Sequence, residues 1–324
     1  MKTKHALLAL VLFAGSALAK DVTIKFSHVV AVDTPKGQMA LKFKELVEKK
    51  SDGKMVVEVY PNSQLFNDKK VLKALLLGDV QMAAPSLSKF SRFTKKLQVY
   101  DLPFLFKDMA AVEKFQQGEK GQALLNAMEE KGLVGLGYLH NGLKQLSANQ
   151  PLMVPADAKG KKFRIMSSDV LEAQFEAVDA IPLKKPFSEV FTLLQTKAID
   201  GQENTWSNTY SKKFFEVQSD ITESNHGLLD YMVVTSKKFM DKLNDEQKAI
   251  IKSSLKEALL LGNKLSAEKA TGDKQKIADS GVSKIHTLSA EQRQQWVEAM
   301  KPVWKKFESD IGADVIEAAI KSND

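Results

Sequence analysis

Two periodicities alternate along the first third of this chain, and that alternation limits the folds it can adopt. Residues 22–27 alternate apolar and polar side chains with a period of two, and valine-rich residues 55–60 also read as a strand. Between them, residues 35–50 are apolar at helical spacing, with Pro35 early and Gly53 past the end. Helices at 68–77 and 108–131 and strands at 80–84 and 133–138 continue the predicted pattern. Strands that alternate with helices favour an α/β fold with a largely parallel sheet.

The pattern changes near Asn141 and Gly142, where the chain is predicted to leave a first domain. A strand at 144–149 crosses over, and a strand at 229–235 returns. Between the crossings we predict a strand at 162–166, a helix at 170–178 capped by Ser168, and a helix at 187–197 that ends in a turn at 200–201. The predicted division is domain I at 20–141 plus 230–269, and domain II at 142–229 plus 270–324, with a cleft between them.

One predicted helix is unusually long. It begins at Asn244, with Gln247 three residues on as a capping-box partner, and continues without proline to about Ala278. At 1.5 Å per residue it spans roughly 50 Å, which is long enough to brace both domains. The alternative is two helices broken at Gly262 or Gly272, because an interior glycine costs roughly 1 kcal/mol.

The first nineteen residues have the composition of a secretory signal peptide. Lys2 and Lys4 precede a short apolar run at 6–14, and Ala17 and Ala19 are small residues at the cleavage position. We therefore predict cleavage after Ala19 and a mature protein in the periplasm. The apolar run is shorter than the roughly 20 residues that a membrane-spanning helix needs.

Composition excludes several chemistries. The chain has no cysteine, so a disulfide, a thiolate nucleophile and a zinc–thiolate site are ruled out. The net charge of +7 comes from lysines that are spread over predicted helix faces, which argues against a nucleic-acid groove. The length is sufficient for two domains with cores of their own.

Catalytic and cofactor motifs are mostly absent. Gly135 and Gly137 begin a dinucleotide fingerprint, but His140 stands where the third glycine belongs. The five histidines are dispersed and none has metal-ligand spacing on a helix. Glu172 and Glu176 lie one helical turn apart, which is typical of a solvated helix face. We predict no catalytic residues, no metal and no cofactor, although catalytic groups that converge from distant positions stay open.

Arginine is rare in this chain, which draws attention to each one. Only Arg92, Arg164 and Arg293 occur among 47 basic residues. A guanidinium binds a carboxylate through two parallel hydrogen bonds, which an ammonium cannot do. Arg164 lies in the strand predicted at 162–166, so it is a candidate anion clamp; the alternative is a rim arginine with a solvated head.

Three segments in order carry a resemblance to a known family. They are 160–165 (GKKFRI), 186–190 (PFSEV) and 194–204 (LQTKAIDGQEN). Together with 26–28 (FSH), 141–145 (NGLKQ) and the long late helix, they resemble the solute receptors of TRAP (tripartite ATP-independent periplasmic) transporters, the DctP-type proteins. Within that family the chain is most similar to the four-carbon dicarboxylate receptors.

The resemblance implies a two-domain clamshell that closes on an organic acid and delivers it to a membrane permease. Arg164 matches the family arginine that pairs with the ligand carboxylate, Asn204 matches an asparagine beside it, and Phe187 matches an aromatic wall. Lys144 stands where sialic-acid receptors of the family carry a second arginine, which points away from sialic acid. Lys144 is also a candidate for the distal carboxylate. Weaker candidates are His28 and Lys36 for the same carboxylate, and Trp206 and Tyr210 for the rest of the pocket.

Each weaker candidate also has a structural interpretation. Trp206 fits a core, Tyr210 a packing contact, Lys36 the start of a helix, and His28 a buried hydrogen bond. At the level of function three alternatives stay open: a monocarboxylate receptor, a receptor that serves a sensor kinase, and an exported enzyme on a bilobed fold. The sequence does not separate succinate, malate and fumarate as the preferred acid.

Overall fold

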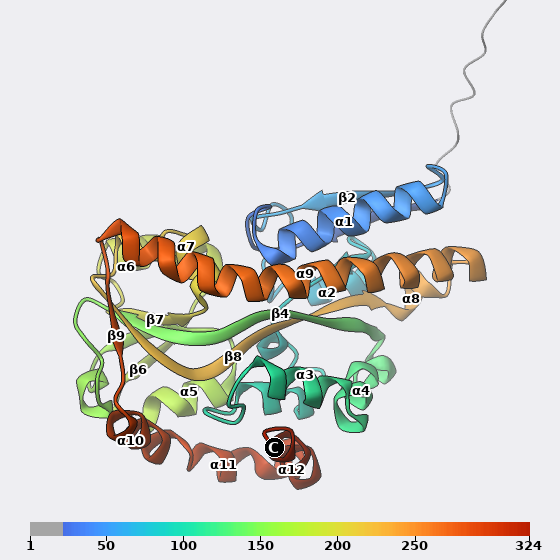
Figure 1. Cartoon of the computed structure of the whole chain (residues 1–324). Coiled ribbons are helices and arrows are strands. Elements are labelled where there is room, and N and C mark those ends of the chain that lie inside the picture. Colours follow the sequence, from blue (N-terminus) through green and yellow to red (C-terminus); the bar gives the residue numbers. More distant parts are fainter. Residues whose placement is uncertain (1–21) are drawn as a thin grey trace, which may run out of the picture.

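One nine-stranded sheet runs through the computed structural model, which describes residues 22–324 (Figure 1). The predicted signal peptide and its cleavage site lie outside the described residues. The strand order is β2-β1-β3-β8-β4-β7-β5-β6, and β9 pairs with β8. The strands are β1 (Val22–Ser27), β2 (Met55–Tyr60), β3 (Met82–Ala83), β4 (Leu133–Ala148), β5 (Lys162–Ile165), β6 (Ile181–Lys184), β7 (Gly201–Asn204), β8 (Asp220–Ser236) and β9 (Lys284–Thr287).

We call β1, β2 and β3 the first half-sheet and β5, β6 and β7 the second half-sheet. Within each half the strands pair in parallel. The long strands β4 and β8 join the halves, and they pair with each other and with their neighbours β7 and β3 in antiparallel register. The prediction of a largely parallel sheet is therefore wrong at the centre, where the chain crosses between the halves.

The crossing strands are much longer than the sequence indicated. β4 contains both the predicted strand at 133–138 and the one at 144–149, and β8 begins nine residues before the predicted strand at 229–235. The residues between continue the pairing through register shifts, one of them between His140 and Gly142. Gly142 has φ +118°, a conformation that L-residues rarely adopt, which allows the strand to bend without ending.

The first half-sheet carries α1 (Pro35–Lys50) and α2 (Val71–Leu77). Thr34 caps α1 by accepting a hydrogen bond from the Gly37 amide, and Pro35 occupies the first turn, as predicted. α2 begins three residues later than predicted, and β3 is shorter than the predicted strand at 80–84. The segment 84–95, which contains the 3₁₀ turn η1 (Leu87–Lys89), follows β3 without regular periodicity.

The predicted helix at 108–131 consists of separate pieces. α3 (Met109–Gln117) ends at Gly118, whose backbone is extended, and α4 (Glu119–Asn126) follows, before the turn η3 (Glu129–Lys131). Asp108 caps α3 through the Ala111 amide. The apolar spacing was correct on each side of the break, but the single continuous helix was wrong.

The second half-sheet is built from shorter elements. Ser168 caps α5 (Asp169–Glu176) through the Leu171 amide, as predicted. The predicted helix at 187–197 is a 3₁₀ turn, η5 (Phe187–Glu189), followed by α6 (Val190–Gln195). α7 (Trp206–Ser211) begins directly after β7 and is capped by Thr205. The other short turns are η2 (Lys96–Asp101), η4 (Pro155–Ala158) and η6 (Phe214–Glu216), and α8 (Lys237–Met240) follows β8.

The long helix is continuous. α9 (Asp245–Ser280) has the predicted capping box between Asn244 and Gln247, and it contacts α1, β4 and α7, so it braces both halves of the molecule (Figure 1). The predicted alternative, a break at Gly262 or Gly272, is excluded. A Cβ at Gly262 would lie 2.6 Å from Leu139 and 3.0 Å from Met39, so glycine permits close packing of α9 against β4 and α1 there.

The C-terminal helices pack on elements from both sides of the strand crossing. After β9 come α10 (Ala290–Met300), α11 (Val303–Ile311) and α12 (Ala313–Lys321). α12 packs on α3, and the indole nitrogen of Trp304 donates a hydrogen bond to the Pro103 carbonyl. The predicted domain boundaries stay a prediction. They place 270–324 in domain II; α11 contacts α5, which is also in the predicted domain II, whereas α12 contacts α3, which is in the predicted domain I.

Two large buried apolar clusters form the core. One joins α2, α3, α11 and α12, and includes Phe90, Tyr100 and Phe307. The other joins α1, α5 and α9, and includes Phe43 and Phe163. Among residues 22–324, no helix is long and apolar enough to cross a membrane. This close-packed apolar core fixes the strand ends that carry the polar side chains described next.

Candidate anion-binding site

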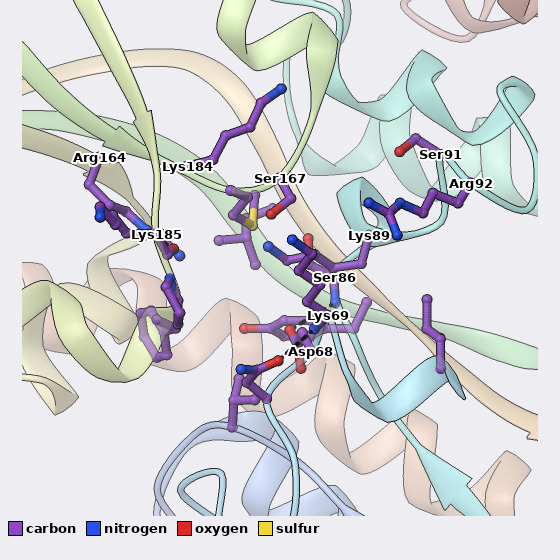
Figure 2. A pocket seen from close by; sticks show the side chains of 18 of the residues that line it. Asp68, Lys69, Ser86, Lys89, Ser91, Arg92, Arg164, Ser167, Lys184 and Lys185 are labelled. Carbon is purple, nitrogen blue, oxygen red and sulfur yellow. Dashed lines mark hydrogen bonds between the residues drawn. The ribbon is translucent and has the colours of Figure 1, made fainter. Parts of the chain in front are cut away.

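A cavity of about 720 Å³ is lined by residues from both halves of the molecule (Figure 2). We call segments 29–30, 67–72 and 86–95 the first wall, and segments 164–169, 184–187 and 204–208 the second wall. Leu229 and Tyr231 of β8 complete the lining. Two acidic side chains, Asp68 and Asp169, line the cavity, against seven cations: Lys69, Lys89, Arg92, Lys95, Arg164, Lys184 and Lys185. The excess of positive charge suits an anionic ligand.

Arg164 is the most deeply buried of these cations, with 2% of its surface exposed. It lies on β5, and its Nε donates a hydrogen bond to the Lys185 carbonyl oxygen at 3.0 Å, which fixes the direction of the guanidinium. No carboxylate of residues 22–324 lies within 4 Å of it. Burial lowers the pKa of Arg164 to about 10, partly offset by the charge of Glu203, so it stays protonated at neutral pH.

Asn204 presents a hydrogen-bond donor beside Arg164 on the second wall. Its Oδ1 already accepts hydrogen bonds from the Asn208 amide group at 2.8 Å and from the Thr205 backbone at 3.3 Å. Its Nδ2 donates one hydrogen to Gln202 Oε1 at 3.0 Å, which leaves the second hydrogen. Because the oxygen is engaged twice, the free part of this amide matches an anion and not a cation.

Phe187 lines the second wall next to Arg164. The centre of its ring lies 5.8 Å from the Arg164 guanidinium carbon and 5.6 Å from Lys212 Nζ. Phe214 packs against it edge to face, with ring centres 5.8 Å apart. The structure therefore brings together Arg164, Asn204 and Phe187, three of the residues that the resemblance selected.

Lys144 lies outside the cavity lining and is paired within the protein. Its Nζ contacts Glu203 Oε1 at 2.7 Å, and both side chains are buried. Glu203 Oε2 accepts hydrogen bonds from His226 Nε2 at 2.8 Å and Gln174 Nε2 at 3.1 Å. Burial by itself would raise the pKa of Glu203, but the positive charge of Lys144 and the bond from His226 hold that pKa at about 2.

His28 and Lys36 lie behind the cavity lining, not on it. Lys36 Nζ donates to the Ala84 carbonyl at 2.8 Å and sits 3.4 Å above the ring of Tyr231, which does line the cavity. Burial lowers the pKa of Lys36 to about 8, partly offset by Asp68. Burial, together with the charge of Lys36, lowers the pKa of His28 to about 3, so this imidazole is neutral at pH 7.

Trp206 and Tyr210 lie on α7 and do not line the cavity. Trp206 is 6% exposed and belongs to an apolar cluster with Phe215 and Ile277 of α9. The ring of Tyr210 stacks on Phe215, with centres 5.7 Å apart and planes 6° apart. These contacts correspond to the packing alternatives that the sequence left open for both residues.

Polar contacts connect the two walls around the cavity. Ser168 Oγ, at the start of α5, donates to the buried Asp101 at 2.7 Å, and Asp101 also accepts a bond from Ser88. Lys95 Nζ of the first wall lies 3.5 Å from Asp169 of the second. Because these contacts bridge the two walls, the cavity is partly enclosed.

Sequence reasoning missed several lining residues, above all Lys89, Arg92 and Asp68 on the first wall. One available signal was not used for Arg92. The rarity of arginine, which selected Arg164, applied equally to Arg92. Lys89 offered no such signal, because it lies in a segment without a periodic pattern, and Asp68 was assigned only as the first residue of the helix predicted at 68–77.

A cavity between two half-sheets, lined by a buried guanidinium that no carboxylate of residues 22–324 contacts, is the arrangement of a receptor for a small anionic solute. Residues 26–310 match the model of the bacterial extracellular solute-binding proteins, family 7 (DctP), and the chain belongs to this family. The predicted resemblance to DctP-type receptors is thus confirmed. The family is one of solute-binding proteins, which agrees with the prediction that the chain is not an enzyme.

Named relatives and solved structures extend this result. The chain is 66% identical, over 94% of its length and 91% of the relative's, to the C4-dicarboxylate-binding periplasmic protein DctP of Shewanella loihica. A TRAP periplasmic solute-binding protein of Shewanella oneidensis with bound succinate is 68% identical, with a TM-score of 0.93 over 94% of this chain and 99% of that one. One from Pseudomonas aeruginosa with bound L-malate is 46% identical, with a TM-score of 0.86 over 88% and 99%.

Proposed function

We propose that this chain captures a four-carbon dicarboxylate, such as succinate, malate or fumarate, and delivers it to the membrane permease of a TRAP transporter. The names of the relatives support the ligand class, and the word periplasmic in those names supports the compartment. On this proposal residues 1–19 are a signal peptide that is cleaved after Ala19, and the permease subunits are the partners. No feature of the described residues favours a sensor kinase or a monocarboxylate over this assignment.

The observation that carries the proposal is the buried guanidinium of Arg164, which no carboxylate of the described residues contacts. Removing a charge from water costs several kcal/mol, and a buried cation is normally retained only with a counter-charge. A ligand carboxylate supplies that charge and accepts two parallel hydrogen bonds from the fork. The free amide hydrogen of Asn204 adds a third bond to the same carboxylate, and Phe187 closes one side of the site.

For the distal carboxylate we propose Lys89 on the first wall. Lys89 is half-buried, ends the turn η1 and has no carboxylate of residues 22–324 within 4 Å. Burial and the charge of Arg164 lower its pKa to about 8, and both side chains line the same cavity. A dianion between Arg164 and Lys89 neutralises both cations at once and links the two walls.

The candidates that the sequence offered for this second contact are placed differently. Lys144 already has Glu203 as a counter-charge, and His28 carries no charge at pH 7. Lys36 lies behind Tyr231, so on this proposal it attracts the ligand through the ring without touching it. Trp206 and Tyr210 are proposed to support α7 and not to contact the ligand.

A thermal-shift panel followed by calorimetric titration tests the proposal. A ligand that binds only the native state raises the melting temperature in proportion to the logarithm of its concentration above Kd. We expect a large rise with succinate, malate and fumarate, and little or none with butyrate, citrate or sialic acid. The absence of any shift with all three four-carbon diacids would reject the proposed function.

A further inference from the structure

Asp68 is one of two acidic side chains on the wall of a cavity that is lined mainly by cations (Figure 2). Asp169, the second acid of the lining, is matched by lysines, with Lys184 Nζ at 2.9 Å and Lys95 Nζ at 3.5 Å. Asp68 has no cation of residues 22–324 within 4 Å. An unmatched carboxylate in a site for a dianion repels the ligand, so its presence requires a physical reason.

Local structure does not supply that reason. Asn67 Oδ1, not Asp68, accepts the hydrogen bonds from the Lys69 and Lys70 amides in the turn before α2. The helix begins without a side-chain cap. The one hydrogen bond of the Asp68 side chain is weak, from the Ser86 amide to Oδ2 at 3.3 Å. Its Oδ1 has no donor among the described residues, so it is free to accept one.

The position of Asp68 relative to the proposed clamp supports a role toward the ligand. The negative charge of Asp68 acts against the effect of burial on the pKa of Lys36, Lys89 and Arg164. Lys89 belongs to the first wall, Arg164 belongs to the second, and Asp68 lines the same cavity, so we place Asp68 close to the path between Arg164 and Lys89. A bound diacid would extend along that path and bring its middle carbons near this carboxylate.

We infer that Asp68 accepts a hydrogen bond from a hydroxyl on the ligand, so that the site prefers 2-hydroxy four-carbon diacids such as malate to succinate. The inference rests on the proposed function. A buried acceptor is satisfied by such a donor, whereas succinate has only methylene hydrogens to offer it. An amino group is also a donor, but the surrounding cations repel an ammonium, so a hydroxyl is the substituent that fits.

Calorimetric titration of wild type, Asp68→Asn and Asp68→Ala with succinate, L-malate, D-malate and L-aspartate tests the inference. Asp169→Asn is the matched control, because it removes an acid of the same cavity that is already paired. Wild type should bind one malate enantiomer roughly tenfold more tightly than succinate, the discrimination expected of one hydrogen bond to a charged acceptor. L-Aspartate should bind more weakly than either acid.

The two acids should respond to the variants in opposite directions. Asp68→Ala should bind succinate more tightly, because a repelling charge is gone, and should lose the preference for malate; Asp68→Asn should fall between. Melting curves show whether each variant is folded. If one of the two Asp68 variants is not folded, the affinities of the other variant test the inference. Equal changes for malate and succinate in the folded variants would overturn the inference while leaving dicarboxylate binding in place. Wild type that binds none of the diacids would overturn the proposed function as well.

Discussion

Two regions of this molecule bury positive charge, and they do so in opposite ways. At the strand crossing, Lys144 is buried against Glu203 at 2.7 Å, and His226 and Gln174 occupy the other carboxylate oxygen. On the cavity walls, Arg164 is buried and Lys89 is half-buried, and neither has a carboxylate of residues 22–324 in contact. The first group is complete without a ligand, and the second is not.

This difference gives a criterion that distinguishes structural charges from ligand-binding charges in a receptor of this kind. Burial alone does not identify a binding residue, because Lys144 is less exposed than Arg164. What distinguishes the cavity residues is burial without a counter-charge, which leaves the desolvation cost to be offset by a ligand. Variants of the first region should therefore change stability, and variants of the second should change binding.

The largest expected effect is on stability at the crossing. Glu203→Gln removes the counter-charge of Lys144 and should lower the free energy of unfolding by about 3–5 kcal/mol, the usual cost of breaking a buried ion pair. Chemical denaturation measures it. Glu257→Gln, which breaks the exposed pair with Lys50, is the matched control and should change the free energy of unfolding far less, because water screens that pair. Equal losses in the two variants would remove the distinction between the regions.

The next effect is on binding at the second wall. Arg164→Lys keeps the charge but loses the fork, so it should weaken binding of succinate by about 1.5–3 kcal/mol, and Arg164→Ala should weaken it further. Calorimetry gives the affinities and circular dichroism checks the fold. Arg293→Lys, at an arginine that packs over Phe104, is the control and should bind normally. Wild-type affinity in Arg164→Lys would show that the fork is unimportant.

A smaller effect concerns pH. The pKa of Lys89 is lowered from 10.5 to about 8, and the proposed contact needs the protonated form. Affinity for succinate should therefore be full below pH 8 and fall as pH rises above it, by at most about tenfold per pH unit for one proton. Lys36 has a similar pKa, so the variant Lys89→Arg separates the two. Its affinity should stay level to pH 9.5, and an unchanged pH profile would assign the effect to another group.

Elements whose bounds depend on residues close in the sequence could be predicted from the sequence. The bounds of β1, α1 and β2 matched the prediction, and the capping box of α9 placed its start. The length of β4 was missed because Asn141 and Gly142 are typical of a turn. Only the antiparallel partner β8 keeps the chain extended through that segment, and such a partner is not visible locally.

The site residues also fall into those that the sequence predicted and those that depend on tertiary structure. Residue type and family resemblance selected Arg164, Asn204 and Phe187, which line the cavity. They did not indicate that Lys144 forms an ion pair within the protein, because its partner Glu203 lies on β7, a strand distant in sequence that pairs with β4. Nor did they find Lys89, whose burial depends on how the segment after β3 folds against the second wall. Residue identity reports which chemistry is available, while counter-charges depend on the tertiary structure.

The most direct test of the central claim removes the charge at each end of the proposed contact. Succinamate differs from succinate by one carboxylate that has become a neutral amide, and Lys89→Met removes the cation proposed to face it. Wild type should prefer succinate to succinamate by at least about tenfold, the scale of one charge-assisted hydrogen bond. Lys89→Met should lose most of that preference, whereas Lys69→Met, at an exposed lysine of the same wall, should keep it. An undiminished preference in folded Lys89→Met would contradict the account.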